Sequence, residues 1–493
     1  MRVSSSLKMQ EIDRISIEEK GFGNLLLMEN AGIRLLEESL KYITIENKRI
    51  VCIAGAGNNG GDSLVVARQI FSRYKADVNI IILSEKGTEA FNFNLNLCRN
   101  LGLNIVNIKE NELDASSLID SADLIFDGIS GTGIKGALRG AALDTVNLVN
   151  TSHAIKLSID VPSGIGDSFE NGFSAVQADF TFTIGLPKRC LFIPYTRRFC
   201  GKIKTIKIGF PEELLNDKFL EPDGVDWILA DFDLINEFTP LLNLTDYKNK
   251  RGHLAVFAGS HGTTGAAVLC ADASIRTSAG LVSLFVDEDI YQICAEKTCS
   301  SIMVNTADDN KVSATEKYNA VVIGPGWGEA ESRKSLLLKL IKDSRGVLDA
   351  DALNLLSVLI NKENLKINLQ NKWVITPHPG EFKRLFPDLD PINQPFESVT
   401  KAAEILNCVV LLKGSVSFIS SPDKEGYVVD GVFPKLGTAG SGDLLCGIIG
   451  GYMATGLEPF KAAVLGALIH LRSAQRCSSE HEWFSSEDLL SYI

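Results

Sequence analysis

The stretch from residue 49 to residue 74 constrains the fold most, because it joins an apolar run, a glycine-rich loop and a helical pattern in direct succession. The apolar run Arg49–Ala54 is followed by Gly55-Ala56-Gly57-Asn58-Asn59-Gly60-Gly61-Asp62. From Ser63 to Tyr74, apolar residues recur at helical spacing. Glycines let backbone N–H groups approach a phosphate, and the following helix offers its positive N-terminus. The pattern predicts a strand, a ligand-binding loop and a helix of an α/β sheet.

Further short apolar runs alternate with helical or turn segments along the first part of the chain. They predict strands at 78–83, 104–108, 124–126, 156–159 and 180–184. Such alternation favours a parallel, doubly wound sheet with ligands at the carboxyl ends of its strands. Two more polar loops, Asp127–Gly133 and Asp160–Gly164, directly follow expected strands. We therefore expect the three loops to form one site, with the carboxylates of Asp127 and Asp160 pointing into its cleft.

The residues alone leave the chemistry of these loops open. The first loop has the spacing of a dinucleotide motif at Gly55, Gly57 and Gly60, but it lacks the Gly-Lys-Ser/Thr of a P-loop. Its amide oxygens and the carboxylate of Asp62 suit a cation as well as a ribose. Asp62 is equally compatible with a helix N-cap, and the aspartates of the other two loops are compatible with turn formation.

A chain of 493 residues exceeds what one ordinary core holds, so we expect two domains. Between about residues 211 and 250 the alternation stops and prolines mix with charged residues, and we place the linker there. An apolar run at 253–258, a polar glycine loop at 259–265 and a helical pattern over 266–278 predict a second α/β domain. Its further strands are expected at 281–286, 320–323, 346–348, 373–375 and 409–412.

The most informative stretch of the second domain is Gly437-Thr438-Ala439-Gly440-Ser441-Gly442-Asp443, which precedes an apolar helix over 444–454. Free backbone amides and a helix dipole form an anion hole for developing phosphate charge, and Asp443 is placed to take a proton from an attacking hydroxyl. This favours a kinase of small hydroxylated molecules. The alternative is that Asp443 only caps the helix. The acid pair Asp349 and Asp351 fits Mg²⁺ binding, loop capping or maintenance of the fold.

Composition excludes several classes of function. The net charge is −12, the wrong sign for holding a polyanion, so we expect no nucleic-acid partner. No run approaches the length of a membrane span, and the first residues lack the hydrophobic region of a signal peptide. The ten cysteines contain no C-x-x-C pair, and we interpret them as reduced thiols. We expect a cytoplasmic protein with no membrane partner.

The Gly-x-Gly-Asn-Asn-Gly-Gly-Asp string, Gly131-Thr132-Gly133 and Asp160–Gly164 together resemble the NAD(P)H-hydrate epimerases over about residues 1–212. The resemblance implies a Rossmann-like three-layer sandwich, in which Asp160 is the proton-transfer group. Lys188 also fits the family pattern, although a solvated lysine fits the residues equally well, and Ser63 replaces the family's usual third glycine. The implied K⁺ ligands are Asn59, Asp127 and Ser163, and the implied substrate-binding positions are Asn58, Asn59, Gly60, Gly61, Asp62, Gly131, Thr132, Gly133, Ile134, Lys135, Gly136, Ala137 and Asp160.

Gly440-x-Gly442-Asp443 resembles the ribokinase superfamily, and four more motifs narrow the resemblance to ADP-dependent NAD(P)H-hydrate dehydratases over residues 221–493. These motifs are Gly324–Gly328, Leu348–Leu353, Thr376–Glu381 and Leu412-Lys413-Gly414. The resemblance implies a ribokinase-like α/β fold with Asp443 as the catalytic base. Serines at 417 and 441 replace the family's usual threonines and keep the hydroxyl. The implied hydrate-binding positions are Ala266, Gly326, His378 and Asp443, and the implied nucleotide-binding positions are Lys413, Gly414, Ser415, Val416, Ser417 and Gly442.

With both halves present, the chain resembles the bifunctional NAD(P)H-hydrate repair enzymes. The first domain would then interconvert the R and S epimers of the hydrates NADHX and NADPHX. The second would use ADP to convert the S form to NADH or NADPH, releasing AMP and phosphate. The resemblance implies K⁺ in the first domain and Mg²⁺ in the second, and it leaves the oligomeric state open, a homo-oligomer included. The alternative is an ATP-dependent vitamin or sugar kinase with a non-catalytic N-terminal binding module.

Overall fold

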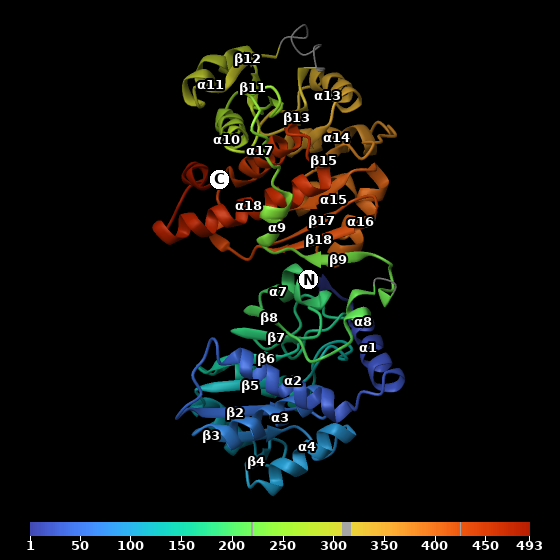
Figure 1. Ribbon diagram of the computed structural model, residues 1–493, viewed down its shortest axis with the longest axis vertical. Coiled ribbons are helices and arrows are strands. Elements are labelled where there is room, and N and C mark those ends of the chain that lie inside the picture. Colours follow the sequence, from blue (N-terminus) through green and yellow to red (C-terminus); the bar gives the residue numbers. More distant parts are fainter. Residues whose placement is uncertain (218–219, 308–316, 424) are drawn as a thin grey trace. The chain divides into compact units, whose positions relative to one another are not determined.

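A computed structural model describes residues 1–217, 220–307, 317–423 and 425–493. The chain divides into two compact units, Met1–Asp226 and Trp227–Ile493, and both are α/β units (Figure 1). The division falls inside the predicted linker at 211–250, of which Lys218 and Phe219 lie outside the described residues.

The first unit is built on a parallel sheet with the strand order β4-β3-β2-β5-β6-β7-β8. The chain moves outward from β2 to β4 and then returns to β5, so the strand order reverses between β2 and β5. Ligands of open α/β sheets bind at the carboxyl edge of such a switch point. The strands of this unit are β1 (Arg2–Val3), β2 (Arg49–Ala54), β3 (Asp77–Ile82), β4 (Asn104–Asn107), β5 (Leu124–Gly128), β6 (Ile155–Ile159), β7 (Phe180–Ile184) and β8 (Lys202–Ile206).

Helices cover both faces of this sheet, which confirms the predicted three-layer, Rossmann-like arrangement. The buried apolar side chains of α2, α3 and α4 form one core with one face of the sheet. Those of α5 and α6 form a second core on the other face. The helices of the unit are α1 (Ser6–Arg14), η1 (Ile15–Glu19), α2 (Asn24–Ser39), α3 (Asn58–Arg73), α4 (Glu89–Asn100), α5 (Glu112–Ser121), α6 (Ala141–Thr151), η2 (Arg189–Leu191), α7 (Pro194–Arg197) and α8 (Glu212–Asn216).

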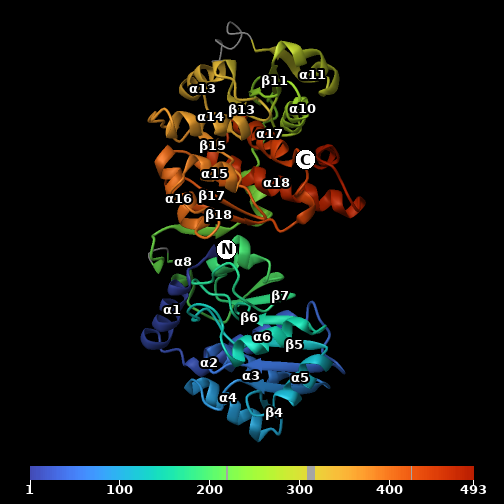
Figure 2. The same ribbon diagram turned by 180° about the vertical axis from the view of Figure 1, so that it is seen from behind.

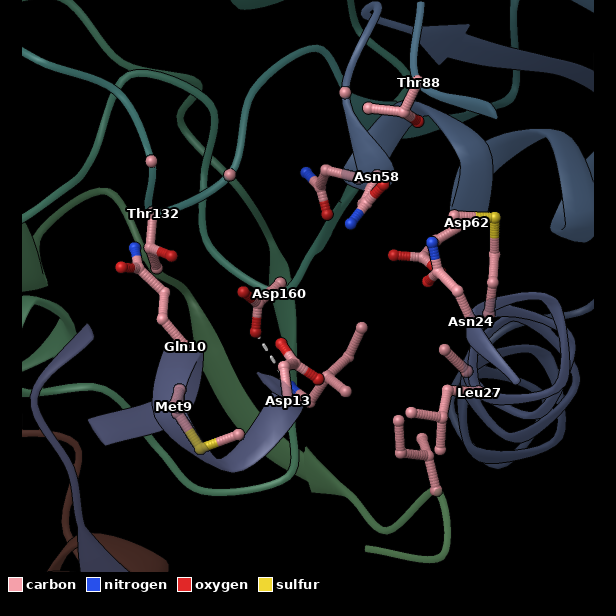
Figure 3. A pocket seen from close by; sticks show the side chains of 18 of the residues that line it. Met9, Gln10, Asp13, Asn24, Leu27, Asn58, Asp62, Thr88, Thr132 and Asp160 are labelled. Carbon is pink, nitrogen blue, oxygen red and sulfur yellow. Dashed lines mark hydrogen bonds between the residues drawn. The ribbon is translucent and has the colours of Figure 1, made fainter. Parts of the chain in front are cut away.

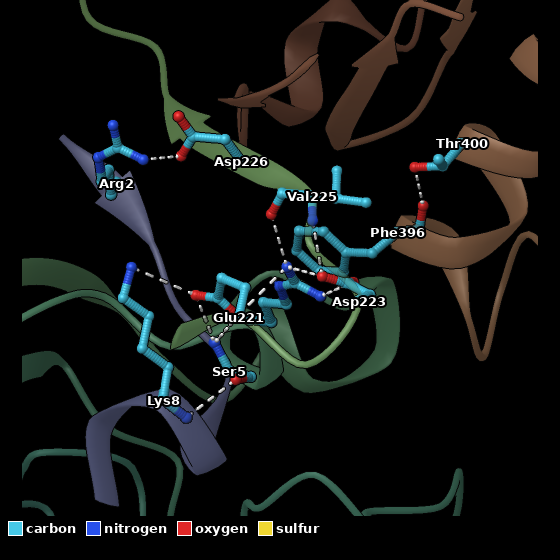
Figure 4. Close-up of polar contacts among 10 residues, drawn as sticks. Arg2, Ser5, Lys8, Glu221, Asp223, Val225, Asp226, Phe396 and Thr400 are labelled. Atoms are coloured by element: carbon cyan, nitrogen blue, oxygen red, sulfur yellow. Dashed lines mark hydrogen bonds and ion pairs between the residues drawn. The ribbon is translucent and has the colours of Figure 1, made fainter. Parts of the chain in front are cut away.

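The end of the first unit is held to its beginning by buried polar groups (Figure 4). Glu221 Oε2 accepts a hydrogen bond of 3.2 Å from the backbone N–H of Ser5, and Glu221 Oε1 lies 3.8 Å from Lys8 Nζ. The side chains of Lys8 and Glu221 are only 1% and 2% exposed. Arg189 forms a second ion pair with Asp223. These contacts fix both the start of α1 and the segment that follows β7.

The sheet of the second unit has the order β9-β18-β17-β16-β15-β14-β13-β10-β11-β12. From β12 to β16 all neighbours are parallel, and the order reverses between β10 and β13, which again creates a switch point. β16, β17 and β18 pair antiparallel, a feature that the apolar pattern did not predict. The strands are β9 (Asp226–Leu229), β10 (His253–Phe257), β11 (Leu281–Val286), β12 (Met303–Thr306), β13 (Ala320–Ile323), β14 (Gly346–Leu348), β15 (Trp373–Ile375), β16 (Val409–Leu412), β17 (Val416–Ser420) and β18 (Glu425–Asp430).

Helices also lie on both faces of the second sheet, in the ribokinase-like α/β arrangement that was predicted. α10, α17 and α18 share a core with one face, while α13 to α16 lie on the opposite side (Figures 1 and 2). None of the helices in the described ranges is long and apolar enough to cross a membrane. The helices are α9 (Asp233–Phe238), α10 (Thr264–Ile275), η4 (Glu288–Ile290), α11 (Tyr291–Lys297), α13 (Ser332–Asp343), α14 (Ala350–Asn361), α15 (Pro379–Leu385), α16 (Pro395–Leu406), η6 (Pro434–Leu436), α17 (Ser441–Ala454), α18 (Pro459–Glu480), α19 (Ser486–Leu489) and η7 (Leu490–Tyr492).

Candidate active sites in the two units

A cavity of about 610 Å³ opens at the switch point of the first unit (Figure 3). The loops after β2, β5 and β6 supply one part of its wall, as their positions at strand ends predicted. The other part comes from α1 and α2, which no motif singled out. The lining includes the predicted residues Asn58, Asn59, Asp62, Gly131, Thr132, Gly133, Ile134, Asp160 and Lys188, and in addition Gln10, Asp13 and Asn24.

The glycine loop delivers its polar residues to this cavity through the first turns of α3. Gly57 is the N-cap, and Asp62 lies one turn inside the helix, so the alternative that Asp62 caps α3 is wrong. Asp62 is only 8% exposed and faces the cavity. Burial raises the pKa of its carboxyl well above the ordinary value, and the negative charges of Asp160 and Asp13 raise it further, while Lys188 lowers it.

Two of the glycines are required because other backbone atoms lie too close for a side chain. A Cβ atom on Gly55 would lie 1.9 Å from the carbonyl oxygen of Ile129, and one on Gly60 would lie 1.8 Å from that of Gly55. Ser63 is buried and packs against Gly128. A Cβ atom on Gly128 would lie 2.7 Å from the Ser63 Cβ. Ser63 does not line the cavity. The missing third glycine thus changes packing between α3 and β5.

Asp160 and Lys188 form the charged centre of the cavity. Asp160 follows β6 in a left-handed backbone conformation (φ 65°), and its Oδ1 accepts a hydrogen bond of 3.0 Å from Ile184 N–H. The Lys188 ammonium forms an ion pair with the same oxygen and donates to the carbonyl of Ile184 and to Thr183 Oγ1 at 2.5 and 3.2 Å. Lys188 is 2% exposed, so the alternative of a solvated lysine is wrong. Held by three acceptors, Lys188 has a fixed position.

Asn59, Asp127 and Ser163 also meet at this edge, around the carbonyl of Ser130. Ser130 O accepts from Asn59 Nδ2 at 3.0 Å and from Ser163 Oγ at 3.1 Å. Asp127 accepts from Ser163 N–H at 2.9 Å and from Ser158 Oγ at 2.8 Å. Its carboxyl is fully buried beneath these loops, which corrects the expectation that it points into the cleft. Burial raises the pKa of Asp127, although its hydrogen bonds lower it.

The predicted substrate loop 131–137 reaches the cavity only with its first half. Gly131 to Ile134 line it, whereas Lys135, Gly136 and Ala137 do not. Gly136 instead donates its N–H to Ser168 Oγ at 2.9 Å, which anchors the far end of the loop.

In the second unit, the loops after β10, β13, β14, β15 and β16 converge near the N-terminus of α17. Lys413 Nζ lies 2.6 Å from Asp349 Oδ1. Asp349 also caps α14 through Ala350 N–H, and Asp351 Oδ2 accepts from Gly328 N–H at 2.7 Å. Burial lowers the pKa of Lys413, but the carboxylates of Asp349 and Glu381 outweigh it, so the net pKa is raised. Both members of the predicted acid pair therefore hold loops in place.

Asp443 lies in the first turn of α17. The N-cap is Gly440 in a left-handed conformation (φ 85°), so the alternative that Asp443 caps the helix is wrong. Burial raises the pKa of the Asp443 carboxyl to about 7, with Asp349 and Asp351 raising it and Lys413 lowering it. A carboxyl with such a pKa exchanges protons readily near neutral pH.

A cavity of about 460 Å³ adjoins this helix start. Five of the six predicted nucleotide residues line it, namely Lys413, Gly414, Ser415, Ser417 and Gly442. Val416 is instead buried as the first residue of β17. The opposite wall is apolar, from β18, the segment 431–437 and α18, and it includes His470. Burial lowers the pKa of His470 to about 4, so its imidazole is neutral. Apart from Gly437, no residue of this wall belongs to a motif noted in the sequence.

The predicted hydrate-binding positions of the second unit lie around the neighbouring loops. Ala266 and Gly326 are adjacent, because a Cβ on Gly326 would lie 3.0 Å from the Ala266 Cβ. His378 is the N-cap of α15, and its Nδ1 accepts from Gly380 N–H at 3.0 Å, so the proton of the neutral ring is on Nε2. Lys413 N–H donates to Pro377 O at 2.9 Å and so ties the His378 loop to the end of β16.

Comparison with known proteins gives matches to both units. Residues 24–190 match a family described as YjeF-related protein N-terminus, and residues 254–493 match one described as NAD(P)H-hydrate dehydratase. A bifunctional NAD(P)H-hydrate repair enzyme of Moorella thermoacetica is 31% identical, over 95% of this chain and 91% of that protein. One of Coxiella burnetii is 31% identical over 96% and 94%.

Among solved structures, an ADP/ATP-dependent NAD(P)H-hydrate dehydratase of Bacillus subtilis is similar to 54% of this chain and 95% of its own, with a TM-score of 0.48 and 23% identity. The curated relatives extend over nearly the whole of both units. On this evidence the chain belongs to the family of bifunctional NAD(P)H-hydrate repair enzymes.

Proposed function

We propose that the protein repairs hydrated NADH and NADPH in two steps, one in each unit. The observation that carries this proposal is that one chain of this family holds a cavity in each unit, with Asp160 lining the first and Asp443 in the first turn of the helix that borders the second. The alternative of a vitamin or sugar kinase with a non-catalytic first unit is not favoured, because the first unit has its own Asp160–Lys188 ion pair in a cavity of about 610 Å³.

In the first unit, R and S hydrates are interconverted with Asp160 as the proton-transfer group. The free N–H groups at the start of α3 suit the pyrophosphate of the substrate. The oxygens of Asn59, Ser130, Asp127 and Ser163 form a compact, oxygen-rich set of the kind that K⁺ prefers. A bound K⁺ would supply positive charge and hold the loops after β5 and β6 together. Lys188 orients Asp160 through its three contacts.

In the second unit, the β-phosphoryl group of ADP is transferred to the hydroxyl of the S hydrate while Asp443 takes the hydroxyl proton. The new phosphate ester then loses phosphate, and loss of a proton from the adjacent carbon restores the ring double bond. AMP and phosphate are the other products. Lys413, Gly414 and the N-terminus of α17 would hold the phosphates, and the apolar wall opposite would take the adenine base.

Mg²⁺ would bind to this site as a complex with the nucleotide. Within the described ranges, no group of three or more His, Cys, Asp or Glu side chains is arranged to hold a metal. Mg²⁺ usually keeps several waters and binds through substrate phosphates with one or two carboxylates, and Asp349 and Asp351 lie close enough to Asp443 to influence its charge. A bound Mg²⁺ would neutralise charge on the transferring phosphoryl group. The ten free thiols suit a reducing compartment such as the cytoplasm.

The decisive experiment uses the full chain with purified R and S hydrates. ADP and the S hydrate should restore the absorbance of the reduced nicotinamide, and ATP tested in parallel shows which nucleotide is used. Epimer exchange is followed separately without nucleotide, with K⁺ or Na⁺. Asp443→Ala should abolish dehydration but keep epimer exchange, and Asp160→Ala should do the reverse. Wild-type protein that restores no absorbance with either nucleotide would refute the dehydratase proposal.

A further inference from the structure

Asp13 is a carboxylate of the first cavity for which the motifs and the matched families give no role. It lies in α1, outside the matched residues 24–190, and it lines the cavity. We propose that Asp13 is a second proton-transfer residue of the epimerisation and works beside Asp160. This inference rests on the proposed epimerase function of the first unit.

The geometry singles Asp13 out from the other charged residues of α1. Glu11 and Arg14 pair with each other, with Arg14 Nε 2.9 Å from Glu11 Oε2, and neither lines the cavity. Lys8 is buried against Glu221. Asp13, in contrast, opens into the cavity, and its carboxyl makes no hydrogen bond or ion pair with any residue in the described ranges. It is free to contact a substrate.

Figure 3 shows that the Asp13 carboxyl lies beside that of Asp160, with Asp62 facing the same cavity from α3. The charged and titratable groups around Asp13 are therefore Asp160, Lys188 and Asp62. Asp13 is exposed, but the cavity walls partly desolvate its carboxyl and raise its pKa to about 6; Lys188 lowers the pKa and Asp160 raises it. Asp160, unlike Asp13, is paired with Lys188. A candidate acid and a candidate base thus lie side by side in the cavity.

The chemistry of the hydrate calls for such a pair. Water adds to the enamine double bond of a dihydronicotinamide with its oxygen on the carbon next to the ring nitrogen, so this carbon carries both the hydroxyl and the nitrogen. Inverting it requires one of these bonds to break and re-form. Since oxygen and nitrogen are attached to the same carbon, an acid and a base acting on them must be neighbours, as Asp13 and Asp160 are.

In the step we infer, Asp160 takes the hydroxyl proton and the O–H electron pair forms a carbonyl. The carbon–nitrogen bond breaks, its electron pair goes to nitrogen, and nitrogen takes a proton from Asp13. Rotation about a single bond then presents the other face of the aldehyde. Nitrogen attacks that face and returns its proton to Asp13, while the oxygen recovers a proton from Asp160. The ring closes with inverted configuration and no net change in the protein.

The test compares Asp13→Asn, Asp13→Glu and the control Glu11→Gln in the full chain. Epimer exchange starts from pure R hydrate, and the amount of S hydrate formed is measured after the epimers are separated. The rate of exchange without enzyme is subtracted. Because Asp13 must be protonated to act, wild-type epimerase activity should fall as pH rises above about 6. Asp13→Asn should lower kcat by about 10²- to 10⁴-fold with little change in KM and should abolish this fall. Asp13→Glu should recover part of the rate and keep the fall.

Dehydratase activity of the same preparations reports whether each variant is folded, and Glu11→Gln should leave both activities unchanged. An Asp13→Asn variant with wild-type rate and pH profile would overturn the inference. So would a slow Asp13→Asn variant that keeps the fall in activity, or loss of the fall in Asp62→Asn instead. Wild-type protein that exchanges no epimers would refute the epimerase function itself, a result distinct from any of these.

Discussion

The raised pKa of Asp443 yields a quantitative prediction for the dehydratase. The change from 3.8 to about 7 amounts to roughly 4 kcal/mol against the ionised form, at about 1.4 kcal/mol per pKa unit. Burial is the largest cause, and the charges of Asp349 and Asp351 add to it. As a base, Asp443 acts only when ionised. The kcat/KM of wild-type dehydratase should therefore rise about tenfold per pH unit below about pH 7 and level off above it.

Asp351→Asn tests the cause of this shift. The amide oxygen of asparagine still accepts the hydrogen bond from Gly328 N–H, which Asp351 Oδ2 now accepts at 2.7 Å, but the negative charge is lost. Since that charge raises the pKa of Asp443, its removal should move the midpoint to lower pH by a fraction of a unit. Asp388→Asn removes the same charge from an exposed site of this unit and should not move it.

The assay is the return of reduced-nicotinamide absorbance across about pH 5 to 9, with both substrates at low concentration so that kcat/KM reports the free enzyme. Thermal unfolding confirms that each variant is folded. A wild-type midpoint below about pH 5 would exclude Asp443 as the base. An unchanged or higher midpoint in folded Asp351→Asn would refute the electrostatic reasoning.

Three further substitutions test packing and ion binding. Gly326→Ala places a Cβ 2.7 Å from the Thr263 Cβ at a φ of 56°, so dehydratase activity and thermal stability should fall, by about 1–3 kcal/mol in unfolding free energy, while epimer exchange persists. Ser63→Gly should leave epimer exchange near wild type, because Ser63 packs against Gly128 outside the cavity; a large gain in rate would contradict this. Ser163→Ala should weaken the stimulation of epimer exchange by K⁺ relative to Na⁺, which a cation titration measures.

The local pattern of residue types was sufficient to predict most strands of the two sheets. The expected strand at 180–184 matches β7 residue for residue, and the one at 281–286 matches β11, because each is a short run rich in aromatic, aliphatic and β-branched residues that the sheet largely buries. Helix starts were less accurate. α17 begins at Ser441, three residues before the predicted 444, because its first turn is polar and glycine-rich and carries no apolar period.

The sequence by itself determined the strand-end loops and the carboxylates on them, since an apolar run followed by a glycine-rich stretch is a local pattern typical of a strand and the loop after it. Only the tertiary structure decided which side chains meet. Asp13 lies in an unremarkable helix and reaches Asp160 only because Glu221, from the other end of the unit, holds the start of α1. Burial of Lys188 and of Asp127 likewise depends on segments far away in the chain. Such contacts produce no periodic pattern in the local sequence, because they join segments that are distant from each other in the chain.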